Sequence, residues 1–382
     1  MNTLSPRERV AIALAHQEPD KVPIDLGEGR ATSLYVDPYV KTAKILGLGK
    51  LEIITSRRNV IDKFDERFLK ALDIDFRRVC LRYQPKYQAF KPGVMGRDEW
   101  GIGWQETGPF WTPVDAPLKN ATIDDLQQYP WPNPIDEGHL KGLREEAEFK
   151  WKNTRYSLVA SLPSHAYGIF TTSYFLRGME NFFVDLMINK EFAWELMDKV
   201  LQVHLKVYER FLEEVGEFIA IVHTGDDLGT QEAPFFSLDL YREMLKPKEK
   251  ALMDLIKNKT EAKIFYHCDG AIFDFIEDLI EIEVDILNPI QHTAKGMDLS
   301  RLKGSFGDRL SFQGGIDQQR VLTGGTTDDV EEEVKRCIDQ LGSGGGYILN
   351  SVHNIMPEVL GENVVQMYRT ARKYGDYPIS GM

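Results

Sequence analysis

Two histidines and an aspartate stand at the ends of predicted β-strands, where they could bind a metal ion. Residues 262–267 are an apolar run that predicts a buried strand, and a polar turn, Cys268-Asp269-Gly270, follows it. Because successive side chains of a strand alternate between its faces, His267 and Asp269 should point to one face and Cys268 to the other. His353 follows the last predicted strand. Two imidazoles and a carboxylate suit zinc, although the spacing alone favours a metal-free, hydrogen-bonded pair.

A second polar group follows the predicted strand at 218–222. Asp226 and Asp227 are adjacent, and neighbouring buried carboxylates repel each other as anions, so one of them can keep a proton near neutral pH. Such a group suits acid–base catalysis, and we take His223, Asp226 and Asp227 as candidate catalytic residues. The alternative is structural: one aspartate caps the following turn, the other is solvated, and His223 is a hydrogen-bonded core histidine.

Eight predicted strands alternate with predicted helices. The strands begin near residues 22, 76, 157, 218, 262, 284, 310 and 346. This alternation predicts a closed, parallel (β/α)8 barrel, in which sites are built from the loops that follow the strands. An open, doubly wound sheet would favour a glycine-rich phosphate loop after the first strand, where Gly27-Glu28-Gly29-Arg30 is only a fragment of one.

The sequence also predicts the positions of helices and contains one irregular segment. Residues 85–134 are rich in Trp, Gly and Pro, and we interpret them as an insertion within a single barrel domain that spans residues 1–382. Ser5-Pro6 and Asp37-Pro38 combine an N-cap residue with proline and predict helix starts. The predicted helices are 6–16, 37–46, 59–72, 173–188, 191–215, 237–258 with an interruption near Pro247, 271–282 and 361–374.

Composition excludes several classes of protein. The chain has 382 residues, with 46 Lys and Arg against 59 Asp and Glu, a formal charge of −13 that argues against a nucleic-acid binder. No apolar run approaches a membrane span or a signal core. Three widely spaced cysteines, Cys80, Cys268 and Cys337, cannot form a disulfide framework and are expected to be structural. We therefore expect a cytoplasmic enzyme without a membrane partner, with a homodimer as the candidate assembly.

A series of motifs occurs in a recognisable order along the chain. They are Pro19-Asp20-Lys21-Val22-Pro23-Ile24, Asp98-Glu99-Trp100-Gly101, Leu176-Arg177-Gly178-Met179-Glu180, Asp226-Asp227-Leu228-Gly229-Thr230-Gln231, His267-Cys268-Asp269-Gly270 and Asp285-Ile286-Leu287-Asn288-Pro289. On these motifs the chain resembles the uroporphyrinogen decarboxylase superfamily over essentially its whole length. The resemblance implies a (β/α)8 barrel and either of two activities, decarboxylation or corrinoid-dependent methyl transfer.

Two differences from the superfamily's sequence patterns help to choose between these two activities. Decarboxylases carry Arg-Gln-Ala-Gly-Arg-Tyr after the first strand, where this chain has Gly27-Glu28-Gly29-Arg30-Ala31-Thr32-Ser33. The methyltransferases bind zinc through His-x-Cys after the fifth strand and a Cys after the eighth, and the matching positions here are His267, Asp269 and His353. Replacing both thiolates by harder ligands favours an oxygen donor over a thiol.

The resemblance therefore implies a methyltransferase that moves a methyl group from a methoxylated aromatic compound to the Co(I) of a corrinoid. A separate corrinoid protein is the expected partner, because the chain has no Asp-x-His-x-x-Gly motif. The predicted substrate contacts are Glu28, Arg30, Trp104, Phe170, Tyr174, Gln291 and Asn350.

Three other readings stay open at this point. One is a corrinoid methyltransferase with an amine, a thiol or a halide as donor or acceptor. Another is a decarboxylase of a small acid that uses Arg30 or Arg177 to bind the carboxylate. The third is a corrinoid-binding or scaffold protein on a barrel that has lost its activity.

Overall fold

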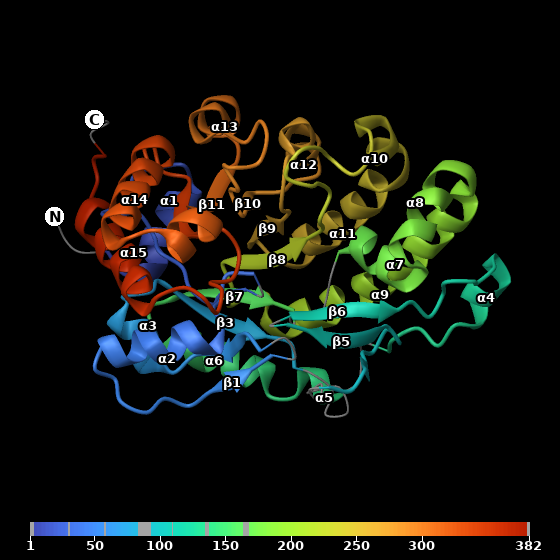
Figure 1. The fold of residues 1–382 in the computed structure, drawn as a ribbon, viewed down its shortest axis with the longest axis horizontal. Coiled ribbons are helices and arrows are strands. Elements are labelled where there is room, and N and C mark those ends of the chain that lie inside the picture. Colours follow the sequence, from blue (N-terminus) through green and yellow to red (C-terminus); the bar gives the residue numbers. More distant parts are fainter. Residues whose placement is uncertain are drawn as a thin grey trace.

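A curled, parallel β-sheet forms the centre of the molecule (Figure 1). The computed structural model describes residues 4–29, 31–56, 59–82, 93–108, 110–133, 137–162 and 168–379. Within these residues seven parallel strands pair in chain order. They are β3 (Phe76–Cys80), β7 (Ser157–Ser161), β8 (Ile221–Gly225), β9 (Lys263–His267), β10 (Ile286–Asn288), β11 (Ser311–Ile316) and β12 (Tyr347–Ser351).

The segment predicted as the first strand closes this sheet. Ile24 pairs in parallel with Leu349 of β12, and the N–H of Leu349 donates to the carbonyl of Pro23 at 2.9 Å. On the other side, the N–H of Asp75, just before β3, donates to the carbonyl of Ile24 at 3.1 Å. The pairing is a bridge rather than a full ladder, and Pro23 contributes no N–H to it. The segment thus lies between the two ends of the sheet, and the predicted (β/α)8 architecture is confirmed.

Asp75 ties this closure to two helices. Its carboxylate is fully buried and accepts a hydrogen bond from the N–H of Ile24 at 2.8 Å. It also pairs with Arg9 of α1 (Pro6–Leu14) at 2.5 Å and with Arg372 of α15 (Gly361–Tyr374) at 2.9 Å. One carboxylate therefore joins the first strand segment, the first helix and the last helix.

Helices surround the sheet. Of these, α6 packs on β3 and β7, and α14 packs on β11 and β12. Besides α1 and α15 they are α2 (Val36–Ile45), α3 (Glu66–Ala71), α4 (Ile123–Gln128), α5 (Glu137–Leu140), α6 (Leu143–Asn153), α7 (Ile169–Arg177), α8 (Met179–Ile188), α9 (Lys190–Val215), α10 (Leu238–Met244), α11 (Lys246–Lys259), α12 (Ile276–Glu281), α13 (Leu299–Phe306) and α14 (Thr327–Leu341).

Three of the predicted helices differ from the structure. The segment 59–72 is not one helix: β2 (Ile61–Lys63) pairs with β1 (Ile54–Thr55), and α3 begins only after Asp65, whose carboxylate caps it. The segment 173–188 is divided between α7 and α8 by Gly178, whose φ of 84° is not helical. The segment 271–282 is a short 3-10 turn (Phe273–Phe275) followed by α12.

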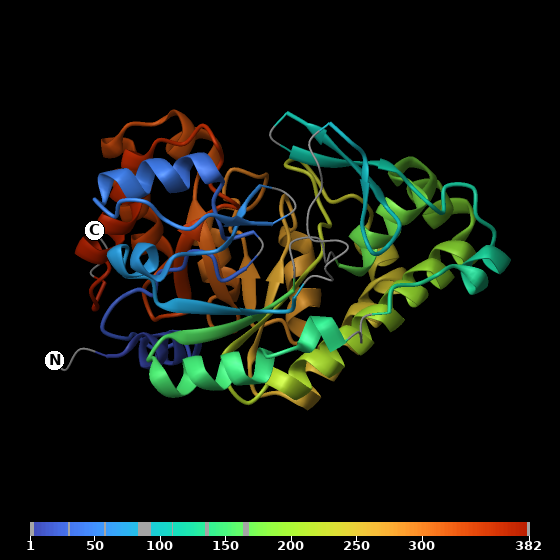
Figure 2. The same cartoon turned by 90° about the horizontal axis from the view of Figure 1, so that it is seen from below.

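The segment 85–134, predicted as an insertion, contains a small antiparallel sheet within its described residues. The strands are β4 (Gly96–Arg97), β5 (Gly103–Thr107) and β6 (Phe110–Asp115), and Figure 2 shows them beside α7 and α8. The carboxylate of Asp98 organises the turn before β5, because it accepts from Trp104 Nε1 at 2.7 Å and from the N–H groups of Trp100 and Ile102. The tryptophans here are therefore packing residues.

The barrel interior changes from apolar to polar along its strands. The lower layer is an apolar cluster in which Val10 and Leu14 of α1 pack against Phe76, Val159, Ile221, Phe265, Ile286 and Ile348. Side chains two residues further along the same strands share that face. They are polar: Arg78, Ser161, His223, His267, Asn288 and Asn350. The polar layer thus lies at the carboxyl ends of the strands, where barrel enzymes place their sites.

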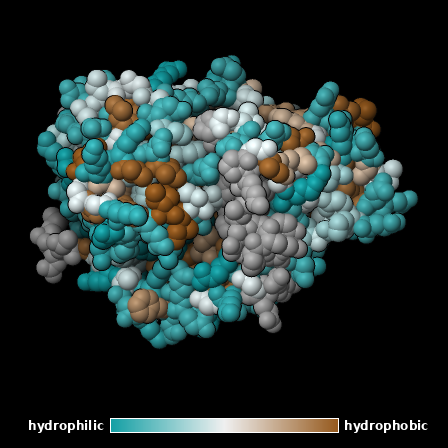
Figure 3. Space-filling model, turned by 60° about the horizontal axis from the view of Figure 1, so that its bottom comes forward, coloured by the Kyte–Doolittle hydropathy of each residue, from teal (hydrophilic) through white to brown (hydrophobic). Residues whose placement is uncertain are grey.

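The surface is mainly hydrophilic. On the face shown in Figure 3, apolar side chains form small groups separated by polar ones. Among the described helices, none is both long and apolar enough to cross a membrane.

The closure makes a prediction about stability. Replacing Asp75 by alanine leaves Arg9 and Arg372 without their shared buried carboxylate, so we expect Asp75→Ala to lower the free energy of unfolding by about 3–5 kcal/mol. Asp376→Ala, which removes an exposed partner of Lys21, should change it by less than about 1 kcal/mol. Urea unfolding measures both, and equal effects of the two substitutions would contradict this role of Asp75.

Candidate metal centre

His267, Asp269 and His353 come together at the carboxyl ends of the strands. One ligand atom from each lies within 4.8 Å of the others. Nε2 of His267 lies 3.6 Å from Oδ2 of Asp269, and the two imidazole rings are 5.6 Å apart between centroids. Among the described residues, it is the one group of three His, Cys, Asp or Glu side chains whose ligand atoms lie this close together. The structure therefore brings together the three residues that the sequence indicated.

The backbone at two residues near the cluster has an unusual conformation, with a positive φ angle. Gly270 has a φ of 94°, and a Cβ there would lie 2.5 Å from the carbonyl oxygen of Thr230, so the turn after Asp269 requires glycine. His353 itself has a φ of 68°, which is uncommon for a residue with a side chain. The hydroxyl of Ser351 donates to the carbonyl of His353 at 2.8 Å and supports this conformation. Strained residues of this kind often occur at functional sites.

Asn288 at the end of β10 orients the ring of His267. Nδ1 of His267 lies 2.7 Å from Oδ1 of Asn288, and the amide NH2 of Asn288 donates to the carbonyl of Gln313 at 3.3 Å. Because the NH2 group is engaged, Oδ1 acts as the acceptor and Nδ1 carries the proton. The lone pair of Nε2 then faces Asp269 and Asp227, whose nearest oxygens lie 3.6 and 4.0 Å away. A metal-ligating histidine is usually held in this way.

The adjacent aspartates after β8 have different environments. Asp226 is buried and accepts from the N–H groups of Phe170 and Thr171 at 2.6 and 2.8 Å, and from the Thr171 hydroxyl at 2.5 Å. It therefore caps the N-terminus of α7, where a negative charge is favourable. Burial raises the pKa of Asp226 to about 7, and these hydrogen bonds act in the opposite direction. Asp227 is 34% exposed and faces His267.

The polar layer also contains a buried network of carboxylates and amides. The amides of Gln313 and Asn350 donate to Asp25 at 3.1 and 2.7 Å, and Gln313 also donates to Glu28. Burial and the neighbouring charge of Glu28 raise the pKa of Asp25 well above its usual value. His223 lies 3.4 Å from Glu28, and its ring stacks on Phe265. The predicted contacts Glu28 and Asn350 thus belong to this network.

The other predicted substrate contacts occupy different places. Trp104 and Phe170 are almost fully buried, Phe170 within a group of aromatic rings that includes Tyr174, so a ligand would reach either ring only if the surrounding segments moved. Gln291 lies near the cluster, where it accepts from the N–H of Gly270 at 3.0 Å. Arg30 lies outside the described residues.

Cys268 takes the position that strand alternation predicts. It is buried, and its sulfur accepts from the N–H of Leu228 at 3.3 Å. Burial raises the pKa of its thiol well above the usual value.

Two residues that matter to the site, Asn288 and Gln313, were missed by sequence reasoning. Asn288 directly follows a predicted strand, and Gln313 is the last residue of one. Their positions were therefore available as a signal, whereas their hydrogen bonds were not.

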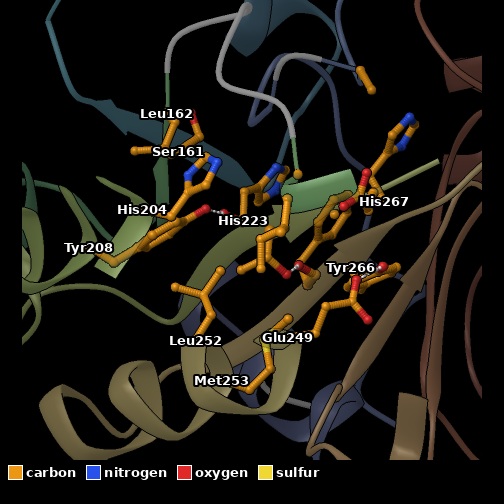
Figure 4. A pocket seen from close by; sticks show the side chains of 17 residues that line it. Ser161, Leu162, His204, Tyr208, His223, Glu249, Leu252, Met253, Tyr266 and His267 are labelled. Atoms are coloured by element: carbon orange, nitrogen blue, oxygen red, sulfur yellow. Dashed lines mark hydrogen bonds between the residues drawn. The ribbon is translucent and has the colours of Figure 1, made fainter. Parts of the chain in front are cut away.

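Two cavities border the cluster. Figure 4 shows the smaller, of about 30 Å³, whose wall includes His223 and His267. This volume suits a water molecule rather than a substrate. Glu249 of α11 also lines this cavity. It accepts from the hydroxyls of Tyr241 and Tyr266, and burial together with the charge of Asp226 raises the pKa of Glu249 to about 8. The larger cavity, of about 500 Å³, includes Asp269 and His353 in its wall.

The three clustered residues fit zinc. Two imidazoles and one carboxylate, with a position left for water or substrate, form a common catalytic zinc site. The closeness of the three ligand atoms meets the requirement for a shared ion. Asp227 lies at the edge of this arrangement, 4.0 Å from Nε2 of His267.

Comparisons with known proteins relate the chain to one family. The model of the family described as uroporphyrinogen decarboxylase (URO-D) matches residues 113–374. A uroporphyrinogen decarboxylase of Syntrophotalea carbinolica is 37% identical over 65 residues, 17% of this chain and 18% of that protein. One of Pelodictyon phaeoclathratiforme is 27% identical over 138 residues, 35% of this chain and 37% of that protein. These matches span well under half the length of either relative.

A solved structure is similar over almost the whole chain. It is a methyltransferase from Methanosarcina mazei, with a TM-score of 0.65 at 15% identity, covering 97% of this chain and 99% of that one. At this identity the similarity shows that the two chains share the fold.

The orientation of His267 can be tested through Asn288. Asn288→Ala removes the acceptor for Nδ1, so the ring can rotate or change tautomer, and we expect zinc affinity to fall about 10–100-fold. Asn153→Ala, at the exposed end of α6, is the matched control and should leave the affinity unchanged. Competition with a chromogenic chelator measures both, and an unchanged affinity in Asn288→Ala would show that this hydrogen bond does not position the ring.

Proposed function

The chain belongs to the uroporphyrinogen decarboxylase (URO-D) family, and from this premise we propose that it is a corrinoid-dependent methyltransferase. The methyl group comes from an oxygen donor, and the acceptor is the Co(I) of a corrinoid carried by a partner protein. The observation that carries the proposal is the cluster of His267, Asp269 and His353 at the mouth of the barrel. A methoxylated aromatic compound, the donor predicted from the sequence, is the first class to assay.

The composition of the cluster supports an oxygen donor. When bound by these three residues, zinc supplies a Lewis acid that stabilises the negative charge developing on the donor oxygen. The three residues offer nitrogen and oxygen ligands and no thiolate, a set that favours hard partners such as oxygen over sulfur. The contribution of the protein is to hold these ligands in place, through the Asn288 contact to His267 and the tight turn at Gly270.

In this proposal Asp227 supplies the proton that the reaction requires. Methyl transfer breaks the bond between the methyl carbon and the donor oxygen and leaves the bonding electron pair on that oxygen, which then takes up a proton. Asp227 is partly exposed and lies 4.0 Å from Nε2 of His267, at the edge of the cluster. Asp226 is committed to the N-terminus of α7. Of the two adjacent aspartates, Asp227 is therefore the proposed proton donor.

A decarboxylase of a small acid is the second candidate, because both curated relatives are uroporphyrinogen decarboxylases. Of the arginines predicted to bind its carboxylate, Arg177 pairs with Asp185 at 2.7 Å and donates to the carbonyls of Leu118 and Ala121. Its guanidinium is thus used within the packing of α7 and α8 rather than in the polar layer of the barrel.

Metal content tests the methyltransferase proposal. Protein purified with zinc present is expected to hold about one ion per chain. His267→Ala and Asp269→Ala should both lose it, whereas His292→Ala, whose imidazole contacts Glu333 outside the cluster, should keep it. Elemental analysis beside circular dichroism measures zinc content and folding together. Zinc-free wild-type protein after this preparation would contradict the zinc mechanism and favour the decarboxylase.

The role of Asp227 predicts a separate kinetic effect. Asp227→Asn keeps the size of the side chain but removes the acid, so we expect kcat for methyl transfer from a methoxyphenol to Co(I) cobalamin to fall about 10²–10⁴-fold. Zinc content should be unchanged, and Asp239→Asn, an exposed residue of α10, serves as the control. A normal kcat in Asp227→Asn would assign proton delivery to another group or to water.

A further inference from the structure

The cavity of about 500 Å³ beside the candidate metal centre has the size of a small-molecule site. Asp269 and His353 form one part of its wall, and loops that follow β8, β10, β11 and β12 form the rest. A methyl donor whose oxygen lies at the metal centre would extend its remaining part, the leaving group, into this space. The chemistry of the wall therefore bears on the identity of the donor.

The wall is rich in hydrogen-bonding groups. It contains five amide side chains and three threonines, and its apolar side chains are Val352 and Met356. Its charged groups are the carboxylates of Asp269 and Asp317. Among the described residues that line the cavity there is no lysine, no arginine and no phenylalanine, tyrosine or tryptophan.

Three of the amides are held in fixed orientations. Oε1 of Gln291 accepts from the N–H of Gly270 at 3.0 Å, and Oδ1 of Asn354 accepts from the N–H of Ser33 at 2.9 Å. Each oxygen is thereby used by the backbone, which leaves the NH2 group for a ligand. Gln318 has the reverse arrangement: its NH2 donates to Thr323 at 3.2 Å, and its Oε1 is buried without a hydrogen-bond partner. A buried acceptor left in this way is costly unless a ligand or a water satisfies it.

Gln318 lies in an unusual local structure. Asp317 caps a single π-helical turn, Gln318–Leu322, by accepting from the N–H groups of Gln319 and Arg320 at 2.8 and 3.1 Å. π-Helical turns are rare in proteins, and those that do occur are often found at functional sites. The turn places the side chain of Gln318 in the wall of the cavity while the residue stays 5% exposed.

The wall therefore offers both hydrogen-bond donors and an acceptor and carries negative charge. A hydroxyl group matches it, because a hydroxyl donates and accepts at the same time. A carboxylate on the ligand would face Asp317 with no lysine or arginine among the described lining residues to balance it. We infer that the leaving group of the methyl donor is a neutral, hydroxyl-rich molecule, so that the donor is the methyl ether of a polyol or a sugar.

This inference rests on the proposed function for the methyl transfer, and it narrows the donor away from methoxybenzoates. The binding of the leaving group can nevertheless be measured without any corrinoid. The probes are a mono-O-methyl-myo-inositol, methyl α-D-glucopyranoside and 3-methoxybenzoate, each titrated calorimetrically into zinc-loaded protein. The variants are Gln318→Leu and Gln291→Leu, with Gln202→Leu on the exposed side of α9 as the matched control.

We expect at least one of the two neutral probes to bind and 3-methoxybenzoate not to bind at the same concentrations. Each cavity substitution removes one hydrogen bond and should weaken that binding about threefold to tenfold, whereas Gln202→Leu should not change it. Binding of 3-methoxybenzoate alone, binding of none of the three probes, or equal affinity in all variants would overturn the inference.

Failure of the proposed function can be distinguished from failure of this inference. If a polyol methyl ether binds with this dependence on Gln318 and Gln291 but transfers no methyl group to Co(I) cobalamin, the cavity assignment stands and the methyltransferase proposal does not. If methyl transfer occurs from 3-methoxybenzoate while the neutral probes do not bind, the methyltransferase proposal stands and the cavity assignment is wrong.

Discussion

Closure of the barrel between β12 and β3 is the constraint on which the site depends. The segment at 22–26 pairs with β12 through a short bridge at Ile24 and with the residue before β3 through a backbone hydrogen bond from Asp75, so backbone pairing alone holds it weakly. Asp75 compensates by binding the N–H of Ile24 together with Arg9 and Arg372. The same segment carries Asp25, which receives hydrogen bonds from β11 and β12 through Gln313 and Asn350. Closing the sheet thus also completes the hydrogen-bonded network around Asp25.

The division of the barrel interior into two layers determines what each polar residue can do. Below, Val10 and Leu14 of α1 close the amino end of the barrel against an apolar layer. Above, polar side chains pair with neighbours in the same layer, as His267 does with Asn288. This arrangement leaves Nε2 of His267 directed toward Asp269 and Asp227. The apolar layer therefore supplies rigidity, and the polar layer supplies oriented ligands.

Within the URO-D family this chain combines the shared barrel with its own site chemistry. The three clustered residues provide nitrogen and oxygen ligands where a thiol-directed site would use sulfur. The adjoining cavity is lined by amides, hydroxyls and carboxylates. Both features favour an oxygen-containing, hydrogen-bonding partner. Fold membership alone does not decide between decarboxylation and methyl transfer, because one fold supports different chemistries through its loops.

Local sequence patterns were sufficient for much of the architecture. Alternation of short apolar runs with helical periodicity predicted the (β/α)8 barrel, and the residues at the strand ends predicted the set His267, Asp269 and His353. These properties follow from neighbours along the chain, since strand alternation alone places His267 and Asp269 on one face. The segment 59–72 was misjudged because pairing between β1 and β2, a contact absent from local propensity, overrides its helical pattern.

Other assignments required the tertiary structure. The sequence presents Asp226 and Asp227 as equivalent neighbours, but packing of α7 against β8 gives one of them the helix N-terminus and leaves the other facing His267. Trp104 and Phe170 were candidates for stacking on a ligand, and packing buries both. The pairing of His267 with Asn288 and the amides around the larger cavity join residues from separate loops. The sequence by itself thus determined which residues reach the strand ends, because that depends on local periodicity. Only the tertiary structure decided which of them meet, because distance and burial are set by elements far apart in the chain.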